Sequence, residues 1–255
     1  MSAGGSALRR LALQLRAVLF WLGWIPSTVL IACLLLLTFP LPILWRYRVA
    51  QTWTLFNVWW LRLTCGVGYR VIGAENIRKV AKAAVIMSKH QSTWETMALQ
   101  RLFPPQVWVL KRELMWIPFF GWGLALVAPI AIQRGAGRRA MDQLLRQGAD
   151  RLARGLWVVI FPEGTRVPPG KTRPYKLGGA VLAAQTGYPI VPVAHNAGRY
   201  WPRHSFIKHP GTVTVVIGEP IEPAGRTPEE LNAEVKAWIE ARMAELDAQP
   251  PPAAV

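Results

Sequence analysis

The chain has 255 residues, of which 52% are hydrophobic and 17% are charged, and it contains two cysteines, Cys33 and Cys65. This composition excludes a disordered protein, a coiled coil and a collagen-like repeat, and two cysteines are too few for a disulfide scaffold or a cysteine-rich metal site. The formal net charge of +16 indicates an anionic partner or surface without identifying it.

The positive charge is concentrated ahead of the C-terminal region. Residues 1–218 carry 27 basic and 6 acidic residues, a net charge of +21, whereas residues 219–255 carry 3 basic and 8 acidic residues. The first 74 residues contain seven arginines and no carboxylate, and they are also the most apolar part of the chain. Because the basic and apolar regions coincide, the charge favours a membrane over nucleic acid, for which no recognised binding motif is present.

The N-terminal region has the composition of a membrane segment. No residue of 17–45 carries a formal charge, and this length is sufficient to cross a bilayer. Trp21, Trp24 and Trp45 lie near the ends of the run, where indole rings favour the membrane interface. Three interpretations are open: one spanning helix, a helical hairpin or wedge in one leaflet broken near Gly23 and Pro26, and a cleaved signal.

Other features of this region bear on those alternatives. Arginines flank both ends of the apolar run, so the positive-inside rule gives no clear orientation, and the balance favours both ends facing the cytosol. The stretch ending at Cys33 matches a lipoprotein signal formally, but the apolar run continues past the cleavage site, which argues against cleavage. Residues 50–64 predict a second, amphipathic helix, in which Trp53, Phe56, Trp60 and Leu63 recur at helical spacing. It either lies in the headgroup plane or packs on the remainder of the protein.

From Cys65 to Asp247, short β-rich runs alternate with helical patterns. This alternation predicts an α/β fold with a mixed, mostly parallel central sheet flanked by helices, behind an N-terminal hydrophobic helical membrane anchor. The expected organisation is a membrane-associated segment at 1–64, a catalytic domain at 65–248 and a disordered tail at 249–255. Strands are predicted at Tyr69–Ile72, Ala84–Ser88, Val107–Leu110, Ile130–Gln133, Trp157–Phe161, Ile190–Ala194 and Thr212–Ile217. Helices are predicted at Thr93–Leu102, Arg138–Arg154, Leu177–Thr186 and Pro228–Leu246.

His90 is the first candidate for chemistry, because it directly follows the apolar strand ending at Ser88. Active sites of α/β sheets tend to lie at such strand-to-helix junctions. If Ser92 caps the next helix, His90 lies in the preceding turn, from which Glu95 can reach its ring. A carboxylate on one ring nitrogen fixes the tautomer and leaves the other nitrogen as a general base. The alternative is structural, since Ser92 to Glu95 is also a capping box, which requires no catalysis.

A second candidate region is the run Phe161-Pro-Glu-Gly-Thr-Arg166, which follows another predicted strand. Its Gly-Thr turn can present backbone amides, and Arg166 can contact a phosphate with two hydrogen bonds. A solvated basic loop is an equally good interpretation of this region. Lys111 and Arg134 also follow predicted strands, and each is either an anion ligand or a surface charge. The aromatic run Trp116–Trp122 either lines a groove for an alkyl chain or belongs to the core.

Four motifs in order carry a family resemblance. They are His90-x4-Glu95, Ala131-Ile-Gln-Arg134, Phe161-Pro-Glu-Gly-Thr-Arg166 and Tyr188-Pro-Ile-Val-Pro192. Together they resemble the glycerolipid acyltransferase superfamily, and within it the 1-acyl-sn-glycerol-3-phosphate (PlsC-type) acyltransferases. The resemblance covers about residues 66–220.

The resemblance implies a direct acyl transfer. His90 would deprotonate the free hydroxyl of lysophosphatidic acid, which then attacks the thioester of acyl-CoA or acyl-ACP to give phosphatidic acid. It implies that Lys111, Arg134, Glu163, Gly164, Thr165 and Arg166 belong to the substrate site. It also implies a protein at the inner (cytoplasmic) membrane whose catalytic domain faces the cytoplasm, with no metal or prosthetic group and no nucleic-acid partner.

Two departures from the family pattern concern the first motif. The family usually has Asn before the histidine and Asp as the carboxylate, whereas this chain has Lys89 and Glu95. Glutamate is chemically equivalent as an orienting group, and Lys89 either adds a cation near the phosphate or points away. The acceptor therefore stays open, with lyso-ornithine lipid, another lysolipid or glycerol 3-phosphate as alternatives. A lipid-binding protein without catalysis is the competing function.

Overall fold

The computed structural model describes residues 3–133 and 135–248. Its α-helices are α1 (Ala3–Leu37), α2 (Ile43–Cys65), α3 (Trp94–Leu102), α4 (Phe120–Ala125), α5 (Arg138–Ala153), α6 (Gly178–Thr186) and α7 (Pro228–Ala248). Its strands are β1 (Val67–Ile72), β2 (Val85–Ser88), β3 (Gln106–Lys111), β4 (Ile130–Ile132), β5 (Trp157–Ile160), β6 (Ile190–His195) and β7 (Gly211–Ile217). Three short 3-10 helices are η1 (Ala74–Lys79), η2 (Arg112–Trp116) and η3 (Ala197–Arg199).

The strands form one mixed, mostly parallel sheet in the order β1-β7-β6-β2-β5-β3-β4. Neighbouring strands are parallel except for β6 and β7, which pair antiparallel. Each predicted strand is present, with its ends shifted by two residues at most. The predicted α/β fold class is therefore confirmed. The central strands β2, β5 and β6 are buried along their whole length, as expected for parallel strands covered on both faces.

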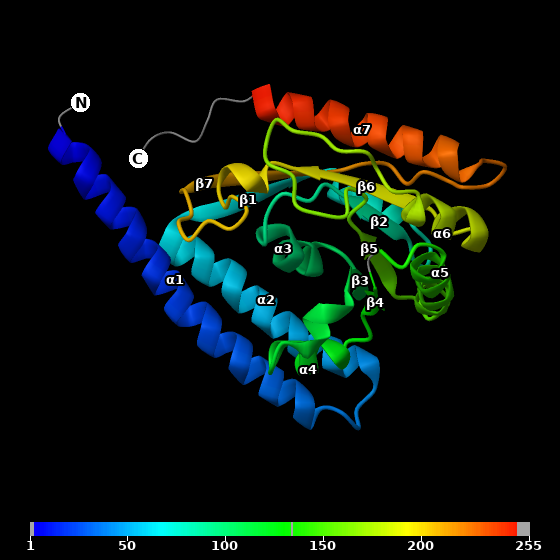
Figure 1. Cartoon of the computed structure of the whole chain (residues 1–255), viewed down its shortest axis with the longest axis horizontal. Helices are drawn as coiled ribbons and strands as arrows, with labels where there is room; N and C mark the ends of the chain where they lie inside the picture. The colour runs from blue at the N-terminus through cyan, green and yellow to red at the C-terminus, as the bar shows by residue number, and fades with distance from the viewer. Residues whose placement is uncertain (1–2, 134, 249–255) are drawn as a thin grey trace.

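Helices cover the two faces of this sheet. Figure 1 shows α7 along one face, with α6 and α5 beside it, and α3 and α2 on the opposite face. Helix α1 lies outside α2 and reaches α4 at its C-terminal end. The predicted helices in the body are present, whereas the short helix α4 was not among the predicted elements. The predicted tail at 249–255 lies outside the described residues.

Helices α1 and α2 form a hairpin, one of the three interpretations left open, but its turn is not near Gly23 and Pro26, where that interpretation placed it. Helix α1 continues through Gly23 and Pro26, and the chain reverses at residues 38–42. Gly23 serves close packing, because a Cβ there would lie 2.1 Å from the indole nitrogen of Trp60. That indole donates to the carbonyls of Leu19 and Phe20 at 3.1 and 3.2 Å. The prediction of a break near Gly23 and Pro26 is wrong, because α2 supports α1 across this region.

Helix α2 packs on the body as well as against α1. Its buried residues include Asn57, Val58 and Leu61, and it contacts α3 and β1. Of the four residues that recur at helical spacing, Trp53 and Trp60 are half-buried, whereas Phe56 and Leu63 are exposed. Because α2 lies between α1 and the sheet domain, its buried surface faces two neighbours and does not follow that single apolar face.

A buried lysine joins α1 to the body. The Nζ atom of Lys208 lies 4.5 Å from the ring centre of Phe20, 4.2 Å from Trp21 and 4.7 Å from Trp201. It also donates a hydrogen bond of 2.9 Å to the carbonyl of Phe206. An ammonium group over aromatic faces is attracted by their electron density, most strongly where water is excluded. These contacts seat α1 firmly on the sheet domain.

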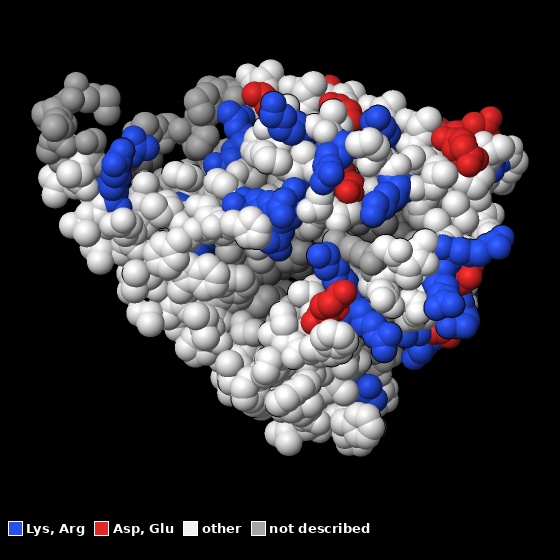
Figure 2. Space-filling view, in the orientation of Figure 1, with Lys and Arg blue, Asp and Glu red and all other residues white. Residues whose placement is uncertain are grey.

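One helical stretch, Ala7–Leu37, is long and apolar enough to cross a membrane. Large apolar side chains on α1, α2 and the α4 region are exposed, among them Leu22, Leu30, Trp59 and Trp122. Figure 2 shows the same arrangement: the lower-left part of the molecule carries few charged side chains, and Lys and Arg gather elsewhere. An apolar surface of this extent is typical of a protein associated with a membrane.

Candidate active site

The candidate catalytic groups lie at one edge of the sheet. His90 follows the end of β2, Lys111 ends β3, and Arg166 lies in the loop after β5. Because β2, β5 and β3 are adjacent and parallel, their carboxyl ends meet at the same edge. Ligands of open α/β sheets bind at this edge. Three of the residues predicted from separate motifs are therefore brought to one place, where they line a common cavity.

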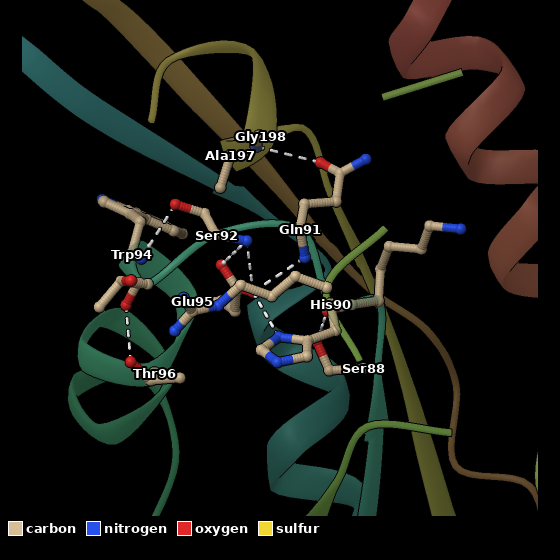
Figure 3. Close-up of polar contacts among 12 residues, drawn as sticks. Ser88, His90, Gln91, Ser92, Trp94, Glu95, Thr96, Ala197 and Gly198 are labelled. Carbon is tan, nitrogen blue, oxygen red and sulfur yellow. Dashed lines mark hydrogen bonds and ion pairs between the residues drawn. The ribbon is translucent and has the colours of Figure 1, made fainter. Parts of the chain in front are cut away.

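His90 and Glu95 are in contact, and the same carboxylate also holds the turn between them. Nδ1 of His90 lies 2.8 Å from Oε1 of Glu95. The carboxylate accepts the backbone amides of Gln91 at 2.9 Å and Ser92 at 2.8 Å (Figure 3). The two interpretations of Glu95, dyad partner and member of a capping arrangement, are thus satisfied together. Helix α3 begins at Trp94, so its N-cap position is Thr93, one residue later than predicted. The amide of Trp94 nevertheless donates to the hydroxyl of Ser92.

The backbone and ring of His90 are fixed from several sides. Its imidazole stacks on Phe161 with ring centres 3.8 Å apart and an angle of 11° between the planes. Its amide donates to Oε2 of Glu163 at 2.9 Å, and its carbonyl accepts the amide of Val167 at 2.7 Å. With Nδ1 engaged by Glu95, Nε2 is the ring nitrogen left for a substrate in the cavity. This is the geometry of an oriented general base.

Glu95 is fully buried and ionised in this arrangement. Burial raises the pKa of its carboxyl, but His195, the hydrogen bond and charge of His90 and the amide of Ser92 outweigh burial and hold the pKa below its ordinary value. His195 is itself buried and structural, with Nε2 lying 2.8 Å from the carbonyl oxygen of Lys89. Burial lowers the pKa of His195, opposed by the charge of Glu95 and by the hydrogen bond from its ring to the carbonyl of Lys89.

A largely apolar cavity of about 500 Å³ opens beside His90. Its walls come from the hairpin, from β3 and from the segment η2–α4, so the anchor and the sheet domain build it together. The apolar and aromatic lining residues include Trp24, Ile31, Ala32, Leu35, Trp53, Trp108, Leu114, Phe120, Leu124 and Val127. This volume is in the range of ligand pockets. In the aromatic run Trp116–Trp122, Phe120 lines the cavity as one interpretation expects, whereas Trp116 and Trp122 are exposed and belong neither to the cavity lining nor to the core.

Among the predicted site residues, Arg166 has the surroundings best suited to binding an anion. Its half-buried side chain lines the cavity, and its Nε has no hydrogen-bond partner among the described residues. Burial lowers the pKa of its guanidinium, opposed by Glu95 and assisted by Arg203. Since arginine stays charged in proteins, a half-buried guanidinium with an unused donor favours an anionic ligand. Lys111 supplies a second, exposed cation on the same cavity.

Other predicted site residues are placed differently. The side chain of Glu163 is buried beneath His90 and outside the cavity lining, which does not support direct contact with an acceptor. Gly164 adopts a left-handed conformation with φ of 67° and forms the turn, and Thr165 is half-buried beside it. Arg134 lies outside the described residues. Lys171 and Arg173 are exposed, as in a solvated basic loop.

Lys89 points away from the cavity, into the protein. Its Nζ lies 2.7 Å from Oε1 of Glu163 and 2.9 Å from Oε1 of Glu240 on α7. The charged residue directly before His90 was visible in the sequence, but its partner in the C-terminal helix was not. Within residues 3–133 and 135–248, no cluster of three or more His, Cys, Asp or Glu side chains could hold a metal ion.

This chain is similar to known proteins over most of its length. Residues 68–196 match the protein family described as Acyltransferase. A 1-acyl-sn-glycerol-3-phosphate acyltransferase of Pseudomonas aeruginosa is 47% identical over 237 residues, covering 91% of this chain and 91% of the relative. The beta form of that enzyme in Homo sapiens is 35% identical over 150 residues, covering 58% of this chain and 54% of the relative.

A solved structure has the same fold. The crystal structure of the 1-acyl-sn-glycerophosphate (LPA) acyltransferase PlsC from Thermotoga maritima aligns with a TM-score of 0.79 and 24% sequence identity. The alignment covers 95% of this chain and 99% of that chain. It therefore includes both the N-terminal hairpin and the sheet domain.

Proposed function

The chain belongs to the acyltransferase family, and we propose that it transfers a fatty acyl group from acyl-CoA or acyl-ACP to the free hydroxyl of lysophosphatidic acid. The product is phosphatidic acid, for phospholipid biosynthesis. One observation carries this proposal: an oriented histidine, a half-buried arginine and an apolar cavity meet at one edge of the sheet. The printed names of the relatives support lysophosphatidic acid as the acceptor.

In the proposed reaction His90 acts first as a base and then as an acid. Glu95 holds the proton on Nδ1, and Nε2 takes the proton of the acceptor hydroxyl as its oxygen attacks the thioester carbon. The tetrahedral intermediate collapses with cleavage of the C–S bond, and the imidazolium returns its proton to the departing thiolate. These steps account for every bond and proton without a metal or prosthetic group. The acyl donor is a co-substrate.

Arg166 and Lys111 bind the phosphate of the acceptor in this proposal. A guanidinium contacts phosphate through two parallel hydrogen bonds, which fixes orientation as well as adding affinity. The phosphate would then lie beside His90 and bring the acceptor hydroxyl toward Nε2. Glu163, Gly164 and Thr165 shape the loop that carries Arg166.

The proposed location is the inner membrane, with the sheet domain facing the cytoplasm. The acceptor is a lipid, whereas acyl-CoA and acyl-ACP are water-soluble, so the active site must reach both. The hairpin returns the chain to the side on which it started, which supports an anchor within one leaflet over a single crossing. The basic surface beside the hairpin suits an anionic leaflet.

The phosphate contact gives the first prediction. The purified full chain in detergent is expected to acylate lysophosphatidic acid with oleoyl-CoA and to acylate the phosphate-free monoacylglycerol poorly. Arg166→Ala should raise KM for lysophosphatidic acid about 10- to 100-fold, since a hydrogen bond to a charged group contributes about 1.5–3 kcal/mol. The variant should leave KM for oleoyl-CoA unchanged. Product is counted as phosphatidic acid together with released thiol.

Two outcomes would contradict this assignment. If Arg166→Ala leaves KM for lysophosphatidic acid unchanged, the phosphate lies elsewhere. If the folded wild type is inactive with this pair, acyl-ACP and a panel including lyso-ornithine lipid and glycerol 3-phosphate identify the acceptor. Inactivity with all of them would favour a lipid-binding protein without catalysis.

The cavity gives the second prediction. Ala32 lies on α1, lines the cavity and is nearly fully buried, so Ala32→Phe should fill part of the space available to an alkyl chain. We expect the ratio of kcat/KM for long-chain to short-chain acyl-CoA to fall about 10- to 200-fold, the discrimination that small volume changes give in apolar pockets. Leu36→Phe, on the exposed side of the same helix, is the matched control. Equal chain preference in both variants would place the alkyl chain outside this cavity.

A further inference from the structure

A buried charge network lies beneath the turn at residues 90–93 and outside the cavity lining. Lys89 is 1% exposed, and its ammonium group contacts the carboxylates of Glu163 and Glu240. The same ammonium donates to the carbonyl of Lys171 at 3.3 Å. The ammonium thus donates hydrogen bonds to Glu240 and to the carbonyl of Lys171 and forms an ion pair with Glu163, so its charge is compensated where it lies.

The network connects two distant parts of the chain to His90. Glu163 uses one oxygen for Lys89 and the other for the backbone amide of His90, at 2.9 Å. Glu240 comes from α7 and also accepts the hydroxyl of Tyr175 at 2.8 Å. The order of contacts is therefore α7, Lys89, Glu163 and the His90 amide.

The geometry separates this network from substrate binding. Neither Lys89 nor Glu240 lines the cavity, and the side chain of Glu163 is fully buried. Burying a lysine is costly unless it is paired, so its position calls for a role in the fold or in the site. Its direct chain neighbour is the proposed base, and the carboxylate that it holds accepts that neighbour's amide.

We propose that Lys89 is a positioning residue for acyl transfer: it keeps Glu163 ionised beneath the His90 amide, and Glu240 of α7 holds Lys89 in place. An ionised carboxylate accepts an amide hydrogen bond about twice as strongly as a neutral group does. The charge on Glu163 thus fixes the position of the His90 backbone, and with it the position of the imidazole ring relative to Glu95 and the cavity. This inference rests on the proposed role of His90 as the base.

The pH at which Glu163 becomes protonated provides a readout for the role of Lys89. A purely structural role of Lys89 would not change the pH dependence of kcat. Burial raises the pKa of the Glu163 carboxyl above its ordinary value; Lys89 and the His90 amide oppose this shift, and the charge of Glu240 adds to it. Tyr175 is the other titratable group at this cluster, and burial raises its pKa far above its ordinary value, so it stays neutral. Removing Lys89 takes away the cation that opposes burial, so Glu163 should become protonated at higher pH.

The experiment compares kcat against pH for the full chain and for Lys89→Met. We expect kcat of the variant to fall about 10²-fold in the neutral range, the size of effect that a displacement of about 1 Å at a catalytic group can cause. The loss should grow as pH falls and shrink as pH rises, while KM for both substrates stays constant. Lys89→Arg should restore most of kcat. Lys79→Met, which breaks the exposed Lys79–Glu219 pair at 2.6 Å, is the matched control and should match the wild type.

A double-mutant cycle tests the contribution of α7. Glu240→Ala should lower kcat in the wild-type background and have no further effect in Lys89→Met, because both changes remove the same support. Independent losses from the two changes would overturn the coupling. A loss of kcat in Lys89→Met that is equal at every pH, or no loss at all, would overturn the positioning role.

A measurement without turnover separates this inference from the proposed function. The backbone amide signal of His90, followed by NMR in detergent, should shift with pH in Lys89→Met as Glu163 titrates, and stay constant in the wild type over the same range. That result would hold even if the wild type were inactive with lysophosphatidic acid. A His90 amide that is insensitive to pH in both proteins would overturn the inference. If Lys89→Met does not fold, Glu240→Ala and Lys89→Arg are measured in the same way.

Discussion

His90→Ala is expected to lower kcat on the order of 10²–10⁴-fold, the contribution typical of a positioned general base. Nε2 is the atom placed to take the hydroxyl proton, and alanine offers no substitute. KM for both substrates should change little, because the arginine and the cavity remain. The variant should fold normally, since the His90 amide and carbonyl, which hold the turn, belong to the backbone.

The control for this variant is an exposed histidine that does not line the cavity. His204 is exposed and adopts a left-handed backbone conformation with φ of 59°, which asparagine tolerates. His204→Asn should therefore keep wild-type turnover and stability. Turnover by His90→Ala within tenfold of the wild type would remove His90 from the mechanism, given that a general base contributes at least about 10²-fold.

Two substitutions at Glu95 should separate its catalytic contact from its structural ones. Glu95→Gln keeps an oxygen at the position of Oε1, which faces Nδ1 of His90 and the amides of Gln91 and Ser92, but it removes the negative charge. We expect kcat to fall on the order of 10²–10⁴-fold with stability largely kept, because the neutral amide no longer stabilises the imidazolium that forms as His90 takes the proton. Glu95→Ala removes every one of these contacts and should in addition lower the free energy of unfolding by about 3–5 kcal/mol.

The pH dependence of stability checks the same carboxylate. The pKa of Glu95 in the folded state lies below its ordinary value. The ionised carboxylate therefore stabilises the fold fully at any pH above that ordinary value. This contribution is lost as pH falls toward the folded-state pKa. Urea unfolding curves at acidic pH should therefore show a weaker pH dependence for Glu95→Gln than for the wild type. Equal turnover of Glu95→Gln and the wild type would show that Glu95 only holds the turn.

Much of the sheet domain could be predicted because its signals are local. The strands β2, β5 and β6 are continuous apolar runs bounded by turn residues, and α7 begins at a clear capping sequence. The contact between His90 and Glu95 was predictable for the same reason, since five residues and one turn determine it. Arg166 was found because its motif follows a strand.

What could not be predicted depends on partners far along the chain. Gly23 resembles a helix breaker until Trp60 is known to pack against it. The family resemblance implies that Glu163 belongs to the substrate site, and only the fold shows that it lies beneath His90. The pairing of Lys89 with Glu240 spans 151 positions, and no spacing rule connects them.

Because α1 and the sheet domain line the cavity together, α1 cannot be removed from the chain without removing part of the cavity wall. Trp24, Ile31 and Ala32 of α1 form part of the cavity wall, and Phe20 and Trp21 of the same helix surround the ammonium of Lys208. A shortened, detergent-free form that lacks residues 1–40 would lose a wall of its own binding site and leave a buried cation without its aromatic neighbours. Under the proposed function, the single helix α1 would therefore serve attachment to the lipid surface through its exposed face and recognition of the alkyl chain through its cavity face.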